Sequence, residues 1–114
     1  MKEIANYPSL RNKVVLVTGG AAGIGESIVK NFLEQGSKVA FLDKDAQLGN
    51  ALVENLNIYD HKALFKECDL VNIPDLQNKI KEIQNELGPI SILVNNAGND
   101  ERHNIDDVTP EFWD

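Results

Sequence analysis

Four glycines in one short segment could bind an anion through the protein backbone. Residues 18–25 read TGGAAGIG and lie between a short apolar run and an amphipathic one. The first amides of a helix have no partner within it and the helix dipole is positive there, so a phosphate group can be held without positive side chains. Glycine also lets a ligand approach the backbone closely. A tight strand-to-helix turn without a ligand is the alternative interpretation.

Three glycine patterns compete for this segment. G-x-G-x-x-G fails because Ile28 would occupy its third glycine position. The P-loop pattern G-x-x-x-x-G-K-[ST] puts Glu26 where a lysine must face a triphosphate, a reversal that costs on the order of 4 kcal/mol. We therefore reject nucleoside triphosphate hydrolysis. The pattern T-G-x-x-x-G-x-G is matched at every fixed position, by Thr18, Gly19, Gly23 and Gly25.

The rest of the chain predicts the elements that position this turn. Apolar runs predict buried strands over residues 13–17, 38–43, 63–69 and 90–94. Helical periodicity predicts helices from Ile24 to a glycine cap at Gly36, over 45–56, and from about 72 to 87. Residues 109–111 signal a further helix. Alternating strands and helices indicate parallel strands joined by right-handed crossovers, an α/β layered sheet.

Apolar residues at four-residue spacing indicate which faces of these helices pack. Ile24, Ile28 and Phe32 would line the first helix, and Leu48, Leu52 and Leu56 the second. In the third helix Leu76, Ile80, Ile83 and Leu87 form the apolar face, and the charged face is expected to be solvated.

Length and composition bound the class of protein. The 114 residues allow one domain, and 42% hydrophobic with 25% charged residues is typical of a globular chain. The net charge of −7 leaves no broad basic surface, so we expect no nucleic-acid partner. No apolar run approaches the roughly 20 residues of a membrane span and the start has no signal-like stretch, so we expect no membrane partner and a cytoplasmic location.

The glycine segment, together with NNAG at residues 95–98 and an acid closing the second strand, resembles the short-chain dehydrogenase/reductase (SDR) family over about residues 12 to 114. The resemblance implies a Rossmann-like, doubly wound parallel sheet in the order 3-2-1-4, and a truncated NAD(P)-binding domain over 1–114. It also implies a complete enzyme that moves hydride between an alcohol or carbonyl substrate and nicotinamide. The backbone of Gly19, Ile24 and Gly25 would line the pyrophosphate.

Asp43 is the candidate for choosing the nucleotide. It closes the second strand 18 residues after Gly25, near the spacing of about 20 expected for a carboxylate that binds the adenosine ribose. An added 2′-phosphate would face its negative charge, so NAD is favoured over NADP. Lys44 follows directly and could soften this preference. An ordinary helix-capping acid is the alternative interpretation of Asp43.

Two further segments complete the implied cofactor site. By resemblance, Asp69 would accept a hydrogen bond from the adenine amino group and Leu70 would line the base; alone, Asp69 could equally cap the following turn. Asn96, Ala97 and Gly98 follow the fourth strand, where ligands collect in open α/β sheets. A turn that only stabilises the sheet is their alternative interpretation.

Catalytic residues cannot be assigned. The family uses a serine and a tyrosine followed four residues later by a lysine, whereas Tyr7 is followed by Arg11 and Tyr59 by Ala63. We therefore expect this chain alone to be inactive. A naturally short, inert dinucleotide-binding or interaction module is the alternative to part of an enzyme.

The remaining reactive side chains are assigned no function. His61 and His103 lack metal-ligand spacing, and Cys68 on an apolar strand is typical of a core residue.

The fourth strand would normally be covered by a fifth. Left as an edge, it predicts association, hence a homo-oligomer. The family resemblance implies a small-molecule substrate for the complete enzyme.

Overall fold

The computed structural model describes residues 8–96, and the predicted helix at 109–111 lies outside that part of the chain. A short 3-10 turn, Pro8–Leu10, precedes a parallel sheet in the order β3-β2-β1-β4. The strands are β1 (Val14–Thr18), β2 (Lys38–Asp43), β3 (Leu64–Glu67) and β4 (Ile92–Asn95), and the helices are α1 (Gly23–Glu34), α2 (Ala46–Asn55) and α3 (Ile73–Leu87). The predicted partial Rossmann-like sheet is confirmed.

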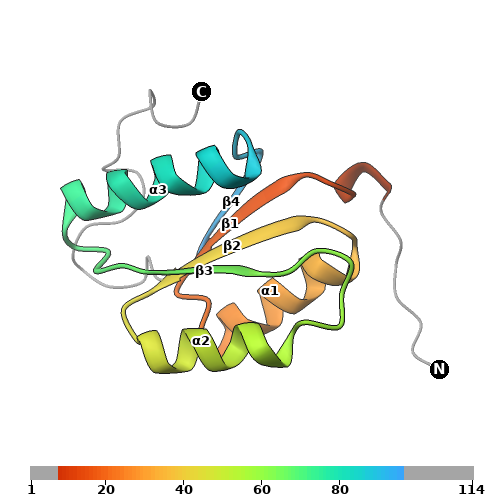
Figure 1. The fold of residues 1–114 in the computed structure, drawn as a ribbon, viewed down its shortest axis with the longest axis horizontal. Helices are drawn as coiled ribbons and strands as arrows, with labels where there is room; N and C mark the ends of the chain where they lie inside the picture. Colours follow the sequence, from red (N-terminus) through yellow and green to blue (C-terminus); the bar gives the residue numbers. More distant parts are fainter. Residues whose placement is uncertain (1–7, 97–114) are drawn as a thin grey trace.

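Helices cover both faces of the sheet, as Figure 1 shows, with α3 on one side and α1 and α2 on the other. Val14 and Leu16 of β1 belong to the core beneath α3, and Val15 and Val17 to the core beneath α1 and α2. Every residue of β1 is buried, which explains why its sequence is apolar from Val14 to Val17 rather than alternating. The sheet is doubly wound around this central strand.

Local signals set the ends of the helices. Past the end of α1, the Gly36 amide donates to the carbonyl of Leu33 and the Ser37 amide to that of Phe32, with Gly36 at φ 85°. This is the Schellman arrangement that the predicted glycine cap requires. Asp45 caps α2 by accepting from the Leu48 amide, and Asn72 caps α3 in the same way.

The structure corrects part of the predicted packing. Leu48 is 47% exposed and Ile24 is 73% exposed, so neither belongs to the core faces expected for them. In α2 the buried residues are Gly49 and Leu52, because the helix approaches β3 closely where the Phe65 ring lies against Gly49. An i, i+4 pattern predicts that these residues share one side of the helix, but it does not show which side faces the sheet.

The strand boundaries also differ from expectation. β3 has only four residues, so Cys68 and Asp69 lie beyond it, and β4 begins two residues later than predicted. β4 pairs with β1 alone among the described strands, which places it at one edge of the sheet.

Candidate cofactor site

The carboxyl ends of β1, β2 and β4 meet at one edge of the sheet. The chain leaves β1 toward the layer of α1, whereas β4 is reached through α3 in the opposite layer (Figure 1). Strand order reverses beside β1, and in open α/β sheets ligands bind in the crevice at such a point. Thr18, Asp43 and Asn96 are brought together here, although they are far apart in sequence.

Thr18 connects β1 to β4. Its side chain is 1% exposed, and its hydroxyl donates to the Asn95 side-chain oxygen at 2.9 Å. The next residue, Gly19, has φ 68° and donates its amide to the Leu42 carbonyl of β2 at 2.7 Å. Thr18 therefore fixes where the glycine turn begins. The sequence did not predict this role of Asn95, for which the Asn-Asn doublet was the available signal.

The turn ends at an uncapped helix N-terminus. The N-cap residue is Ala22, whose side chain cannot accept a hydrogen bond from the first amides of α1. Gly23 is exposed, has φ 62°, and a Cβ added to it would meet nothing within 4 Å. The first turn of α1, including the exposed Ile24, is therefore open to a ligand. These features fit a diphosphate bound by backbone amides.

Gly25 is required by close packing rather than by its φ angle. A Cβ on Gly25 would lie 2.0 Å from the Gly19 carbonyl oxygen and 2.9 Å from Nδ2 of Asn96. The start of α1 thus lies directly against the start of the turn, which keeps the first amides of the helix beside the ends of the strands.

Asp43 contacts the glycine turn through its carboxylate. Its Oδ2 accepts from the Ala21 amide at 3.2 Å, and its Oδ1 accepts from the Asp45 amide at 3.0 Å. The cap of α2 is Asp45, so Asp43 is not the helix cap considered as its alternative role. Lys44, between them, is exposed. The contact with Ala21 is a second finding that the sequence did not predict.

Asn96 holds the other side of the same turn. Its Nδ2 donates to the Gly19 carbonyl oxygen at 3.0 Å. The turn is therefore tied to both neighbours of β1, through Asp43 at the end of β2 and Asn96 just after β4. Ala97 and Gly98 lie outside the described residues.

Asp69 and Leu70 follow β3 at the same edge of the sheet. Asp69 is exposed, and its Oδ1 accepts from the Val71 amide at 3.2 Å, so it does close the local turn. Leu70 is half-buried and packs against the core beneath α3. The structure does not test the adenine contact expected of them.

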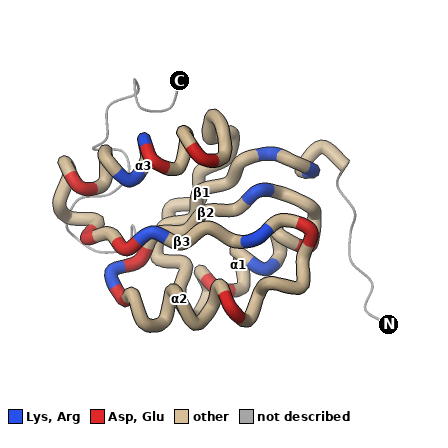
Figure 2. Tube along the Cα trace, viewed as in Figure 1, with Lys and Arg blue, Asp and Glu red and all other residues tan. Residues whose placement is uncertain are grey.

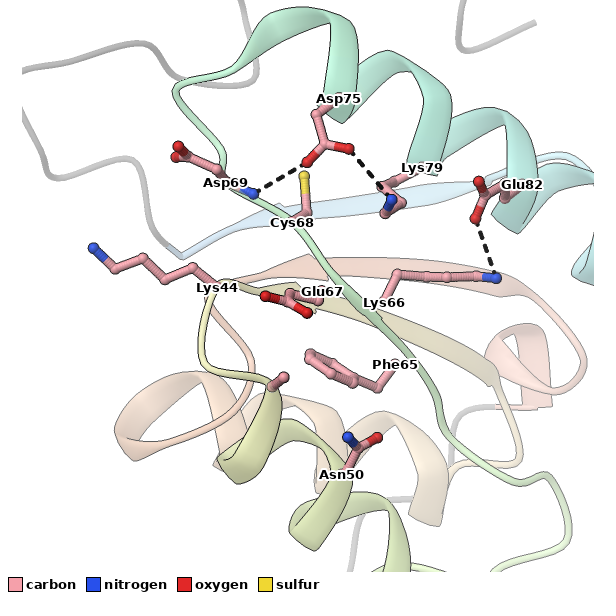
Figure 3. A pocket seen from close by; sticks show the side chains of 11 residues that line it. Lys44, Asn50, Phe65, Lys66, Glu67, Cys68, Asp69, Asp75, Lys79 and Glu82 are labelled. Carbon is pink, nitrogen blue, oxygen red and sulfur yellow. Dashed lines mark hydrogen bonds and ion pairs between the residues drawn. The ribbon is translucent and has the colours of Figure 1, made fainter.

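An open groove of about 610 Å³ runs along the outer edge of β3 (Figure 3). Lys44 and Asp69 lie at one end of it, and Lys66 of β3 lies at the other. Lys66 contacts Glu86 at 2.6 Å and Glu82 at 3.3 Å, and these carboxylates raise its pKa. The charged face of α3 is thus partly paired across the groove, where simple solvation was expected.

The Cys68 thiol is buried in the core. It is 1% exposed, and burial, followed by the proximity of Asp75, raises its pKa to about 12. Asp75 in turn pairs with Lys79 at 3.3 Å and accepts from the Asp69 amide at 3.3 Å (Figure 3). A thiol with a raised pKa stays protonated near neutral pH and is a poor nucleophile, which agrees with the core role expected for it.

Acidic and basic residues are interspersed along the described trace (Figure 2). Between residues 8 and 96, no group of three or more His, Cys, Asp or Glu side chains could hold a metal ion. Over the same range, no helix has the length and apolar character needed to cross a bilayer.

The family model of the short chain dehydrogenases matches residues 13–114. This chain therefore belongs to the short-chain dehydrogenase/reductase family. The resemblance inferred from the glycine segment and NNAG is confirmed by this match.

Individual relatives agree with that assignment. The chain is 43% identical over 110 residues to a D-xylose 1-dehydrogenase of Caulobacter vibrioides, covering 96% of this chain and 43% of the relative. It is 40% identical over 111 residues to a probable galactose dehydrogenase of Rhizobium meliloti, with the same two coverages. It therefore spans less than half the length of these curated relatives.

Solved structures show the same fold. A short-chain dehydrogenase/reductase of Serratia marcescens, solved as a double mutant, superposes with a TM-score of 0.75 at 33% identity, covering 89% of this chain and 43% of that one. A hydroxysteroid dehydrogenase of Escherichia coli gives a TM-score of 0.73 at 32% identity, covering 78% and 36%.

Proposed function

We propose that this chain binds the adenosine diphosphate half of NAD, as the amino-terminal part of an oxidoreductase. The observation that carries the proposal is the uncapped, exposed start of α1 lying beside the Asp43 carboxylate. Backbone amides of Gly19, Ile24 and Gly25 would hold the diphosphate. The bound nicotinamide would supply the chemistry of hydride transfer.

Asp43 supports a preference for NAD over NADP. Both carboxylate oxygens accept hydrogen bonds from backbone amides, so the negative charge is fixed in place, while each oxygen can still accept from a ribose hydroxyl. A 2′-phosphate at the same position would be repelled. Lys44 is exposed and adjacent, so it would reduce this repulsion without removing it.

The other predicted contacts extend the same site. Asp69 and Leu70 would receive the adenine, and Asn96, Ala97 and Gly98 would lie beside the ribose and the middle of the coenzyme. Lys44 and Asp69 lie at one end of the groove in Figure 3, which supports placing the adenosine there.

We propose that catalysis needs groups that the described residues do not supply. Tyr59 is packed against the core beneath α1 and α2, and the residue four positions later is Ala63 rather than lysine. The chain alone is thus expected to bind coenzyme without transferring hydride. Membership of an enzyme family favours this reading over an inert interaction module.

The relatives suggest a class of substrate for the complete enzyme. The two curated relatives described above, at 40–43% identity, are named for xylose and galactose. We therefore propose oxidation of a sugar hydroxyl as the reaction to test first. The homo-oligomer and the cytoplasmic location expected from the sequence stay predictions.

Calorimetric titration of the chain with NAD⁺ and NADP⁺ tests the proposal. We expect NAD⁺ to bind more tightly, and Asp43→Ala to reduce the ratio of the two affinities by about tenfold or more, because the repelling charge is gone. Asp60→Ala is the matched control. It removes the same charge from an exposed side chain that lies 4.0 Å from Arg11, so the preference should stay. An unchanged preference in Asp43→Ala would contradict the ribose assignment.

A further inference from the structure

We propose that Asp43 is also a positioning residue for the diphosphate, because its carboxylate holds the glycine turn in the conformation that exposes the first amides of α1. This inference rests on the proposed function, since the anion in question is the diphosphate of the coenzyme. It assigns Asp43 a role that is independent of the ribose.

The contact that carries the inference links the end of β2 to the glycine turn. Oδ2 of Asp43, at the end of β2, accepts from the amide of Ala21, which lies 22 residues earlier and just before the N-cap of α1. Ala21 is 5% exposed. A buried amide that loses its acceptor keeps the full cost of desolvation, so the turn would have to rearrange to satisfy it.

The carboxylate is itself oriented by a second bond. Oδ1 accepts from the Asp45 amide at 3.0 Å, a local turn that fixes the side chain at the start of α2. The two carboxylate oxygens of Asp43 therefore accept from two amides at once, that of Ala21 in the glycine turn and that of Asp45 before α2. No neutral side chain of the same shape can do this, because an amide group has one acceptor oxygen and one NH₂ donor.

The entry and exit of the turn are held by different groups. Gly19, at the entry, is held by the Leu42 carbonyl and by Nδ2 of Asn96. Ala21, at the exit, is held by Asp43. Loss of the Asp43 contact would release the side of the turn that leads directly into the anion-binding amides.

Removing the Asp43 charge and removing its hydrogen bond to Ala21 should have opposite effects on the affinity for diphosphate. This difference makes the inference testable. A carboxylate close to the turn repels a diphosphate, so by charge alone its removal should tighten diphosphate binding. If the carboxylate shapes the turn, its removal should weaken binding although the repulsion is gone.

The experiment uses the isosteric variant Asp43→Asn, with Asp45→Asn as the matched control. The control removes the same charge two residues away and leaves an oxygen to cap α2, since asparagine is as good an N-cap as aspartate. The probe is inorganic pyrophosphate, which has no ribose and so does not report the sugar contact. Its binding and the hydrogen-exchange rate of the Ala21 amide are both followed by backbone NMR.

We expect Asp43→Asn to bind pyrophosphate about tenfold more weakly than Asp45→Asn, and its Ala21 amide to exchange at least tenfold faster. Binding by Asp43→Asn that equals or exceeds that of the control overturns the inference, and so does unchanged exchange at Ala21. If the unaltered chain binds neither pyrophosphate nor NAD⁺, the proposed function fails. The exchange rate of Ala21 then still shows whether Asp43 holds the turn.

Discussion

Gly25 offers the sharpest test of how the turn and α1 fit together. In Gly25→Ala the new Cβ would stand 2.0 Å from the Gly19 carbonyl oxygen, whereas real Cβ atoms essentially never come within 3.0 Å of such an atom. The helix start or the turn must therefore move by about 1 Å. Because the obstacle is backbone, no side-chain rotation can relieve it.

Two effects of this movement can be estimated. Overpacking of this kind costs about 1–3 kcal/mol of stability. A displacement of about 1 Å also takes an amide from hydrogen-bond distance to well beyond it. With several amides affected, we expect the affinity for NAD⁺ to fall by more than tenfold.

Gly49→Ala is the control for overpacking alone. Its Cβ would lie 2.3 Å from the Phe65 ring, so it should also destabilise the fold, but at the contact of α2 with β3. Urea unfolding measures the loss of stability in each variant, and calorimetry measures NAD⁺ binding under conditions where each is folded. Gly25→Ala that binds NAD⁺ as tightly as Gly49→Ala would refute the packing argument.

Other predictions concern stability. Since the pKa of Cys68 is raised from 9.0 to about 12, the folded chain should lose stability as the pH rises above about 9, and Cys68→Ala should lose less; urea unfolding between pH 8 and 10.5 measures this. Lys66→Met should lower the free energy of unfolding by about 0.5–1 kcal/mol in low salt and by less in 1 M NaCl, because Glu82 and Glu86 are half-exposed and salt screens their ion pairs with Lys66. Chemical unfolding at both salt concentrations measures the difference. Asn72→Ala should cost about 1 kcal/mol by removing the cap of α3, whereas Asn72→Asp should be near neutral; a thermal melt of both variants compares them.

Much of the fold could be predicted because the evidence for it is local. The continuous apolar run at β1 indicates a strand covered on both faces, and Gly36 indicates the end of α1, and both hold in the structure. The strand order came from the family resemblance rather than from any period in the sequence. Leu48 was misplaced because helical spacing alone does not fix which stripe faces the sheet.

The ties within the candidate site could not be predicted. The contact of Asp43 with Ala21 spans 22 residues and that of Asn96 with Gly19 spans 77. Such contacts depend on the register of neighbouring strands and on where each strand ends relative to the next, and no local sequence pattern encodes these. The roles assigned to the site residues therefore stay predictions, although the structure does bring Gly19, Asp43 and Asn96 to one edge.

The position of β4 has a consequence for folding. The hydroxyl of Thr18 finds its Asn95 partner across 77 residues of chain, after every other described element has been synthesised. Closing so long a loop costs entropy and slows formation of the contacts that depend on it. We expect an emerging polypeptide to assemble β1, β2 and β3 first. The segment before α1 would then gain its contacts with Asn95 and Asn96 only when β4 pairs with β1. We therefore expect nucleotide affinity to be acquired late in folding.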